Sequence, residues 1–346
     1  MLPRPLLLAT ALAGLALAGP LTACSTGPTD AVDAAATAST SASPDAGAFP
    51  VTIANDTFGD VTIEEPPTRV AALGTQDGDN LLALGVVPVG VPKVTWGGDA
   101  QGSTPWFQER LADLGAQMPT QYSDADGVPI EQIAEVAPDL ILATNYSLTR
   151  QQYDKLSEIA PVVAYPGDPW TTTWQDSLEL DGRALGLSDE AERIQDRTED
   201  AIDEATADHP ELAGKSFIWG ALSTADLSSI SFYTPQDARP LFLTELGMVN
   251  APVIEDLSEP GQFYGTVSAE RSADLDSDVM ITYGEKESDA ETYAADPLVG
   301  QIPAVESGHL ATFLADPVAL SGTIPTPLAI PYAVEHFVPA IVAALA

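Results

Sequence analysis

Short apolar runs alternate with amphipathic stretches along most of the chain. In the first half, the expected strands are residues 69–73, 86–91, 139–143 and 162–165, and the expected helices are residues 76–84 and 129–136. Apolar runs of this length between helical patterns are typical of parallel strands that helices bury on both faces. Two β-rich runs within residues 50–63 predict a hairpin ahead of them. The pattern therefore predicts an α/β fold.

The second half repeats this pattern after one long helical stretch. The expected strands are residues 216–222, 230–233, 279–283 and 310–313, and the expected helices are residues 239–246, 269–275 and 327–345. Between the halves, apolar residues recur at helical spacing from Ala191 to Ala205, with Ser188 as a candidate N-cap and His209-Pro210 as the end. Nearly three hundred residues usually need two cores. We expect two doubly wound α/β lobes, residues 49–188 and 210–346, joined by a linker helix over residues 189–209.

A short internal match supports two related lobes. Glu131 lies eight residues before Asp139, and Glu270 lies eight residues before Asp278. In each case a glutamate in the first turn of an expected helix precedes an aspartate at the start of an expected strand. Internal similarity of this kind indicates lobes of common architecture.

The N-terminus has the pattern of an exported lipoprotein. Arg4 precedes an apolar stretch, residues 6–18, that is shorter than the roughly 20 residues a membrane-spanning helix needs. Residues 21–24, Leu-Thr-Ala-Cys, resemble the lipobox of bacterial lipoproteins, and Cys24 is the only cysteine of the chain, which excludes an internal disulfide. We expect a signal peptide over residues 1–23, lipidation of Cys24, and a disordered tether of small and polar residues over 24–48.

Charge and composition exclude several function classes. The net charge of −38 makes nucleic-acid binding improbable on electrostatic grounds, but it does not prove a cationic ligand, because an acidic surface also favours solubility. The three histidines, His209, His309 and His336, do not cluster, which disfavours a site for a bare metal ion. Residues 77–80, Asp-Gly-Asp-Asn, lack the later residues of a calcium loop and are interpreted as a helix cap. The chain contains no Gly-x-Ser-x-Gly elbow and no phosphate-binding glycine loop, so no enzyme activity is expected.

Several motifs, in order, resemble one known family. They are residues 69–74, 81–91 and 137–142 in the first half, and residues 267–271, 278–281 and 330–333 in the second. Each motif is loose alone, but their order and spacing are similar to those of the substrate-binding lipoproteins of iron-siderophore ABC importers. The resemblance covers nearly all of the chain after the tether. It implies two α/β lobes joined by one long helix, with the ligand in the cleft between them.

The resemblance also implies a function. The chain is expected to act as a monomer, lipid-anchored on the extracytoplasmic face of the cell membrane, that captures a ferric siderophore and delivers it to an ABC permease. Iron is expected only within the bound chelate, and no cofactor is implied. In such importers one acidic residue on each lobe docks to permease arginines, and by position these resemble Glu131 and Glu270. A glutamate at a helix N-terminus also stabilises the helix dipole by about 0.3–1 kcal/mol, and both roles are compatible.

Ligand contacts are expected in the loops after the strands, because ligands of doubly wound sheets bind beyond the carboxyl ends of the strands. These loops and strand ends nominate Gln76, Lys93, Trp96, Asn145, Tyr146, Trp170, Trp219, Tyr233, Arg239 and Tyr283. Aromatic faces suit a bulky chelate, and Arg239 is best placed to meet an anionic group. For any single aromatic residue, packing in the core is an equally good explanation.

Two other functions stay open at this point. The ligand could be another metal chelate, such as cobalamin or haem, or the chain could be an envelope hydrolase. The chemistry of a siderophore also stays open between catecholate, hydroxamate and carboxylate. The strong acidity disfavours an anionic catecholate unless Arg239 and Lys93 create a local positive region.

Overall fold

Two large β-sheets with helices on their faces, and a separate two-stranded hairpin, make up the part of the chain that the computed structural model describes, residues 43–346. The expected signal peptide, Cys24 and residues 24–42 of the expected tether lie outside this range. Residues 43–48 were also expected to belong to the tether, but the structure shows Asp45 hydrogen-bonded to the first lobe and to α6. The backbone N–H of Asp45 donates to the carbonyl of Gly186 at 2.7 Å, and its carboxylate accepts from the N–H of Asp189 at 3.2 Å. The fold therefore begins a few residues before the expected boundary at residue 49.

The first lobe is built on a five-stranded parallel sheet of order β5-β4-β3-β6-β7. Its strands are β3 (Val70–Ala72), β4 (Gly90–Pro92), β5 (Thr120–Tyr122), β6 (Leu140–Ala143) and β7 (Val162–Ala164). Its helices are α1 (Thr75–Ala83), α2 (Pro105–Asp113), α3 (Ile130–Glu135), α4 (Arg150–Ser157) and α5 (Trp174–Leu185). The expected hairpin is confirmed as β1 (Val51–Ile53) paired antiparallel with β2 (Val61–Ile63). The parallel sheet confirms the prediction made from short, wholly apolar runs.

The second lobe contains a six-stranded mixed sheet, in which β10 is an additional short neighbour of β8. Its strands are β8 (Ser216–Ser223), β9 (Asp226–Tyr233), β10 (Val249–Asn250), β11 (Tyr264–Ser268), β12 (Val279–Gly284) and β13 (Leu310–Leu314). Its helices are α7 (Ala238–Glu245), α8 (Pro252–Leu257), α9 (Asp289–Ala295), α10 (Pro303–Glu306), α11 (Pro317–Thr323), α12 (Ala329–Tyr332) and α13 (Val338–Ala344). Three short 3-10 helices, η1 (Pro210–Leu212), η2 (Ala269–Asp274) and η3 (Val299–Gln301), complete it, together with the π-helical turn η4 (Ala333–Phe337).

Three expectations for this lobe were wrong in detail. The sheet is not wholly parallel, because β9 runs antiparallel to both β8 and β11. The helix expected over 269–275 is the 3-10 helix η2. The helix expected over 327–345 is divided into α12, η4 and α13, and a π-turn of this kind inserts an extra residue into the helical ladder.

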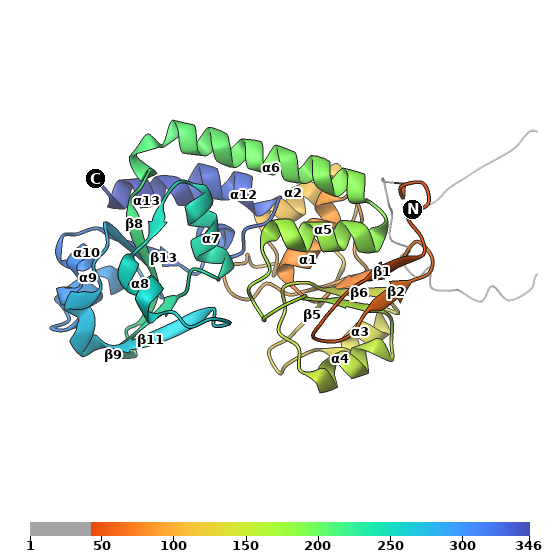
Figure 1. Cartoon of the computed structure of the whole chain (residues 1–346), viewed down its shortest axis with the longest axis horizontal. Helices are drawn as coiled ribbons and strands as arrows, with labels where there is room; N and C mark the ends of the chain where they lie inside the picture. The colour runs from red at the N-terminus through yellow and green to blue at the C-terminus, as the bar shows by residue number, and fades with distance from the viewer. Residues whose placement is uncertain (1–42) are drawn as a thin grey trace, which may run out of the picture. The chain divides into compact units, whose positions relative to one another are not determined.

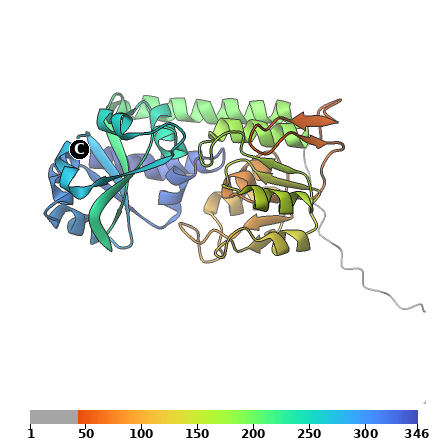
Figure 2. The same ribbon diagram turned by 60° about the horizontal axis from the view of Figure 1, so that its bottom comes forward.

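The long helix α6 (Ser188–Asp208) connects the two lobes at the position expected for residues 189–209. Figure 1 shows it running beside α5 of the first lobe and reaching the start of β8 in the second, and Figure 2 shows the same course from another side. Its buried residues are Ala191, Ile194, Thr198, Ile202 and Ala205. This stripe at helical spacing packs into a hydrophobic core that continues from one lobe into the other.

The internal match has a structural explanation. The carboxylate of Asp139 accepts hydrogen bonds from the backbone N–H and the hydroxyl of Thr68 at 2.8 and 2.7 Å, just before β3. The carboxylate of Asp278 accepts from the N–H and the hydroxyl of Ser216 at 2.8 Å each, at the start of β8. Each aspartate thus fixes the beginning of the neighbouring parallel strand, so the two lobes use the same device at equivalent positions.

Two carboxylates, one buried and one half-buried, join the lobes. Asp79 of α1 accepts hydrogen bonds from Trp106 Nε1 in its own lobe at 2.8 Å and from the hydroxyl of Thr326 in the second lobe at 2.7 Å. Glu245 of α7 accepts from Trp174 Nε1 and from the side-chain amide of Gln175, both on α5, at 3.0 Å each. These bonds, together with α6, hold one lobe against the other.

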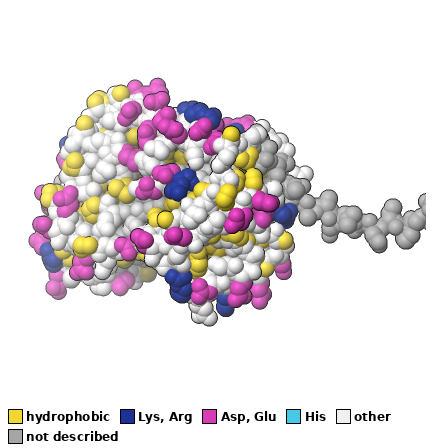
Figure 3. Space-filling model, turned by 45° about the vertical axis from the view of Figure 1, so that its right-hand side comes forward, with side chains coloured by type: hydrophobic (Ala, Val, Ile, Leu, Met, Phe, Trp, Pro, Cys, Tyr) yellow, Lys and Arg dark blue, Asp and Glu magenta, His cyan; other side chains and the backbone are white. Residues whose placement is uncertain are grey.

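The surface is strongly acidic. Figure 3 shows one face on which Asp and Glu side chains are spread widely and Lys and Arg side chains are few, as the 51 acidic and 13 basic residues of the sequence require. No helix within residues 43–346 is both long enough and apolar enough to cross a membrane.

Candidate functional site

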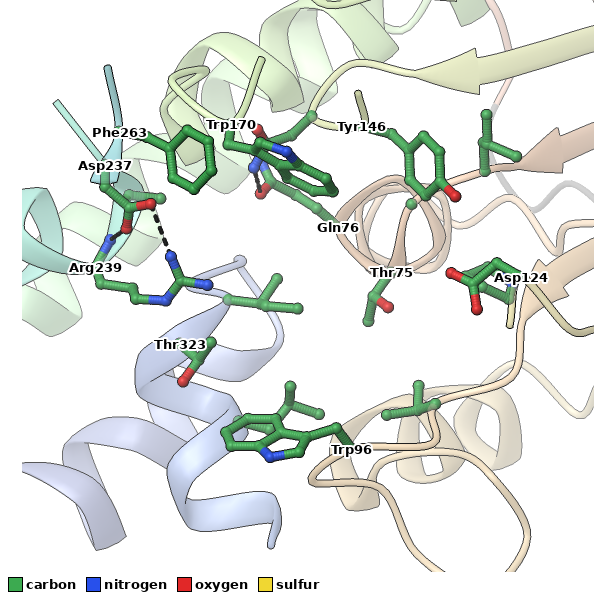
Figure 4. A pocket seen from close by; sticks show the side chains of 18 of the residues that line it. Thr75, Gln76, Trp96, Asp124, Tyr146, Trp170, Asp237, Arg239, Phe263 and Thr323 are labelled. Atoms are coloured by element: carbon green, nitrogen blue, oxygen red, sulfur yellow. Dashed lines mark hydrogen bonds and ion pairs between the residues drawn. The ribbon is translucent and has the colours of Figure 1, made fainter. Parts of the chain in front are cut away.

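A pocket of about 580 Å³ lies where the two lobes face each other, and Figure 4 shows its lining. Every strand of the first sheet contributes a residue that follows its carboxyl end: Gln76 after β3, Trp96 after β4, Asp124 after β5, Asn145 and Tyr146 after β6, and Trp170 after β7. The strand order reverses between β3 and β6, which makes this edge the topological switch point where doubly wound sheets bind ligands.

The second lobe supplies the opposite wall. Tyr233 ends β9, Asp237 and Arg239 begin α7, and Phe263 and Tyr264 lie at the start of β11. Three further residues contribute to this wall: Leu320 and Thr323 of α11, and Ile324, which directly follows α11. Because β9 and β11 pair in antiparallel fashion, with Tyr264 opposite Tyr233, their rings lie 5.7 Å apart at this wall.

Arg239 is the most constrained charged group of the pocket. Its Nη1 donates to Asp237 Oδ2 at 2.7 Å, and its guanidinium lies over the ring of Tyr233, 4.0 Å from the centroid. Burial alone lowers the pKa of Arg239, but the charge of Asp237 outweighs this, so the pKa is raised and the guanidinium stays protonated. Burial also raises the pKa of Asp237, although Arg239 acts in the opposite direction.

Two polar residues and two aromatic residues shape the first-lobe wall. The side-chain amide of Asn145 donates to Gln76 Oε1 at 2.9 Å, which links the loops after β6 and β3. The rings of Tyr146 and Trp170 lie 5.7 Å apart. Trp170 has a φ of +67°, a left-handed conformation that costs a bulky residue energy and that is found most often at functional sites. The fold therefore holds this indole at the pocket against its backbone preference.

The structure brings eight of the ten expected ligand-binding residues together in this pocket: Gln76, Lys93, Trp96, Asn145, Tyr146, Trp170, Tyr233 and Arg239. Tyr283 lies behind the lining, where its hydroxyl bonds to that of Thr323 at 2.9 Å and its ring meets the edge of Trp96 at 5.2 Å. The expectation for Trp219 was wrong. Trp219 is 1% exposed and stacks on Phe337, so it belongs to the core and not to the pocket.

Sequence reasoning missed several lining residues, chiefly Thr75, Asp124, Asp237, Phe263, Tyr264 and Thr323. A signal existed for Asp237. It lies just before the helix that carries Arg239, and aspartate at an N-cap accepts from the first backbone N–H groups, as it does here from Arg239 N at 2.9 Å. Phe263 and Tyr264 reach the pocket because β11 pairs with β9, and nothing in the local sequence of these residues indicates that pairing.

The expected docking residues lie outside the pocket. Glu131 in the first turn of α3 and Glu270 in η2 are both exposed, and neither forms an ion pair within residues 43–346. No group of three or more His, Cys, Asp or Glu side chains in the described part of the chain is arranged to hold a metal ion. Residues 77–80 form the first turns of α1, where Asp77 accepts from Gly74 N at 2.9 Å, which confirms the helix cap.

Comparisons with known proteins identify the family. A family model described as "Periplasmic binding protein" matches residues 70–317. YfiY of Bacillus subtilis, a probable siderophore-binding lipoprotein, is 30% identical over 257 residues, covering 70% of this chain and 74% of that protein. FepB of Escherichia coli, a ferric enterobactin-binding periplasmic protein, is 25% identical over 263 residues, covering 73% and 80%. The structure of PiaA of Streptococcus pneumoniae in complex with ferrichrome superposes with a TM-score of 0.81 at 35% identity and covers 85% of this chain and 98% of that one. The chain belongs to the periplasmic binding protein family.

Proposed function

We propose that the chain is the extracytoplasmic substrate-binding component of an ABC importer, which captures a ferric siderophore and delivers it to the membrane permease. The observation that carries the proposal is the pocket of about 580 Å³ between the lobes, with aromatic walls and a half-buried guanidinium paired to a buried aspartate. Its volume lies within the range of small-molecule sites, and such sites combine apolar walls with a few oriented polar groups. The names of YfiY, FepB and PiaA support a siderophore as the ligand.

The N-terminal sequence supports the cellular location. Residues 21–24 resemble a lipobox, and relatives such as YfiY are named lipoproteins. We propose that Cys24 is lipidated and anchors the chain on the extracytoplasmic face of the cell membrane, where more than one acyl chain gives durable attachment. Capture and delivery need only binding and release, so this function assigns no catalytic step to any residue.

A ferric siderophore is expected to quench the tryptophan fluorescence of the full chain, purified in detergent, in a saturable way at submicromolar concentration. Trp96 and Trp170 line the pocket, and a ferric chelate close to an indole absorbs its emission. The measurement is a titration with a panel of ferric siderophores, cobalamin and haem. The control is the double variant Trp96→Phe, Trp170→Phe, which should lose most of the quenching.

The same titration can contradict the proposal. Quenching by cobalamin or haem alone would assign another metal chelate as the ligand. No response to any chelate, together with turnover in a screen with cell-wall and polysaccharide substrates, would favour an envelope hydrolase.

Replacing both Glu131 and Glu270 by alanine is expected to lower ligand uptake by about tenfold or more, equivalent to about 1.4 kcal/mol of docking free energy. Both carboxylates are exposed and unpaired within residues 43–346, and they occupy equivalent positions before Asp139 and Asp278. They are therefore free to meet cationic side chains of a permease. The measurement is uptake of labelled ligand by cells in which this chain is the substrate-binding component. A titration of the purified variant should show unchanged affinity for the ligand.

The matched control for docking replaces two other exposed acids, Glu135 on α3 and Glu306 on α10, which removes the same charge from the same two lobes. This control should leave uptake unchanged. If the Glu131 and Glu270 variant transports as well as the unaltered chain, docking through these residues is wrong. If both double variants fail equally, overall charge and not these two positions governs delivery.

A further inference from the structure

The charges that line the pocket cancel. The lining includes two cations, Lys93 and Arg239, and two acids, Asp124 and Asp237. Both signs come from both lobes, since Lys93 and Asp124 follow β4 and β5 while Asp237 and Arg239 begin α7. A pocket of this composition offers hydrogen bonds to a ligand but no net positive charge.

Asp237 neutralises the charge of Arg239 through a direct ion pair. Asp237 is 1% exposed in its side chain, and both of its carboxylate oxygens are directed at Arg239, Oδ1 to the backbone N–H and Oδ2 to Nη1. The face of the guanidinium is covered by Tyr233. At this burial the attraction between the two groups is screened far less than at a surface, so the pair acts on a ligand mainly as a dipole.

The paired guanidinium still has hydrogen-bonding capacity. Its printed hydrogen bond to Asp237 uses Nη1 alone, which leaves the Nη2 amino group without a partner within residues 43–346. Figure 4 shows the guanidinium beside the open space of the pocket, with Trp96 below it and Trp170 and Phe263 above. It can therefore donate to a carbonyl or hydroxamate oxygen of a ligand without contributing a net charge.

The other two charges do not change this balance. Lys93 is exposed and forms no ion pair within the described residues, so water screens its charge. Asp124 lies at the opposite end of the space from Arg239 in Figure 4 and is exposed as well, so water screens its charge in the same way. The net charge of −38 further repels anions at longer range.

Ferric chelates differ sharply in charge. Three hydroxamates neutralise one ferric ion, whereas three doubly ionised catecholates leave a trianion. The names of the relatives, which include both ferrichrome and ferric enterobactin, do not fix the class for this chain. Building on the proposed function, we propose that this pocket selects uncharged ferric trihydroxamates over anionic ferric triscatecholates, and that Asp237 is the residue that sets this selectivity.

The test compares ferrichrome with ferric enterobactin on the full chain in detergent and on its Asp237→Asn variant. Asparagine keeps the shape and the N-cap acceptor of Asp237 but removes its charge. The unaltered chain should bind ferrichrome about a hundredfold more tightly than ferric enterobactin, since a trianion would lose its hydration in a pocket that offers no net positive charge in return. In the variant, the affinity for ferric enterobactin should rise at least about tenfold, while that for ferrichrome stays within about threefold.

Asp203→Asn is the matched control, because this exposed residue of α6 does not line the pocket and its replacement changes the net charge of the chain equally. It should leave both affinities unchanged. Equal binding of the two chelates by the unaltered chain would overturn the inference, as would an Asp237→Asn variant that loses both chelates equally or gains neither. If the unaltered chain binds no ferric chelate at all, the proposed function itself fails, which is a separate outcome.

Discussion

Replacing Trp219 by alanine is expected to lower the free energy of unfolding by about 3–5 kcal/mol, the usual cost of removing a buried tryptophan. Trp219 lies on β8, the strand between β9 and β12, and is 1% exposed. Its ring stacks on Phe337 at 5.4 Å, and Phe337 stacks in turn on Phe313 at 4.4 Å. Removing the indole leaves a cavity between the sheet and η4 that this column of rings cannot refill.

Denaturant unfolding monitored by circular dichroism measures this effect. Trp219→Phe should cost clearly less, because a phenyl ring fills part of the volume, and this milder variant serves if the alanine variant does not fold. The control is Trp96→Ala, since Trp96 is 40% exposed and lines the pocket. Its stability should change by less than about 0.5 kcal/mol while ligand binding weakens. A Trp219→Ala variant that keeps its stability but loses the ligand would restore Trp219 to the binding site.

The misplacement of Trp219 shows where local sequence information ends. Strand β8 is buried on both faces, so Phe217 and Trp219 enter one core while Ile218 enters another. An apolar run of this kind predicts a buried strand correctly, but it carries no alternation that distinguishes the two faces. Trp219 was therefore expected in the cleft because it lies late in the strand. Only the packing of η4 against β8 shows that Trp219 belongs to the core.

Strand β11 illustrates a second limit. Its sequence, Tyr-Gly-Thr-Val-Ser over Tyr264–Ser268, is too polar for an apolar-run pattern. Gly265 is required because a Cβ there would collide with the ring of Phe232 on the paired strand β9. Such a close approach depends on a partner distant in sequence, so the antiparallel ribbon that carries Phe263 and Tyr264 into the pocket was not predictable locally.

The first lobe was more predictable because its rules are local. Its strands are short apolar runs, and the residues after them meet at one edge whenever the strands are parallel. Gln76 and Asn145 were nominated on this ground alone, and the structure joins them by a hydrogen bond of 2.9 Å.

In the second lobe, the helix α11 had a local signal, with Asp316 as N-cap and Pro317 in the first turn, although the pattern of apolar residues alone did not reveal this helix.

Replacing Asp79 by asparagine is expected to remove a pH-dependent loss of stability. Asp79 is 1% exposed, its Oδ2 accepts from Trp106 and Thr326, and its Oδ1 has no partner within residues 43–346. Burial raises the pKa of this carboxyl from its ordinary 3.8 to about 7, although the two hydrogen bonds act in the opposite direction. The folded chain therefore keeps this proton at pH values where the unfolded chain has lost it.

The sign of the effect follows from this difference. The contribution of Asp79 to stability is fully present below about pH 4 and is lost as the pH rises to about 7, by about 4 kcal/mol at most. Asparagine resembles the protonated carboxyl, so the variant should equal the unaltered chain near pH 4, exceed its stability slightly near pH 5, and exceed it by the full amount near pH 8. Asp77 and Asp181 are also buried with raised pKa values, so both chains lose stability with rising pH, and the difference between them isolates Asp79.

Urea unfolding of both chains between about pH 5 and pH 8 tests this expectation, with Asp278→Asn as the matched control. The hydrogen bonds from Ser216 and the charge of Lys215 lower the pKa of Asp278, so its titration lies below this range. The control should therefore lose the same stability at every pH tested. Parallel pH profiles for the unaltered chain and Asp79→Asn would contradict the prediction. A difference that grows with pH would show that burial of the carboxyl, which outweighs its hydrogen bonds from Trp106 and Thr326, governs the titration of Asp79.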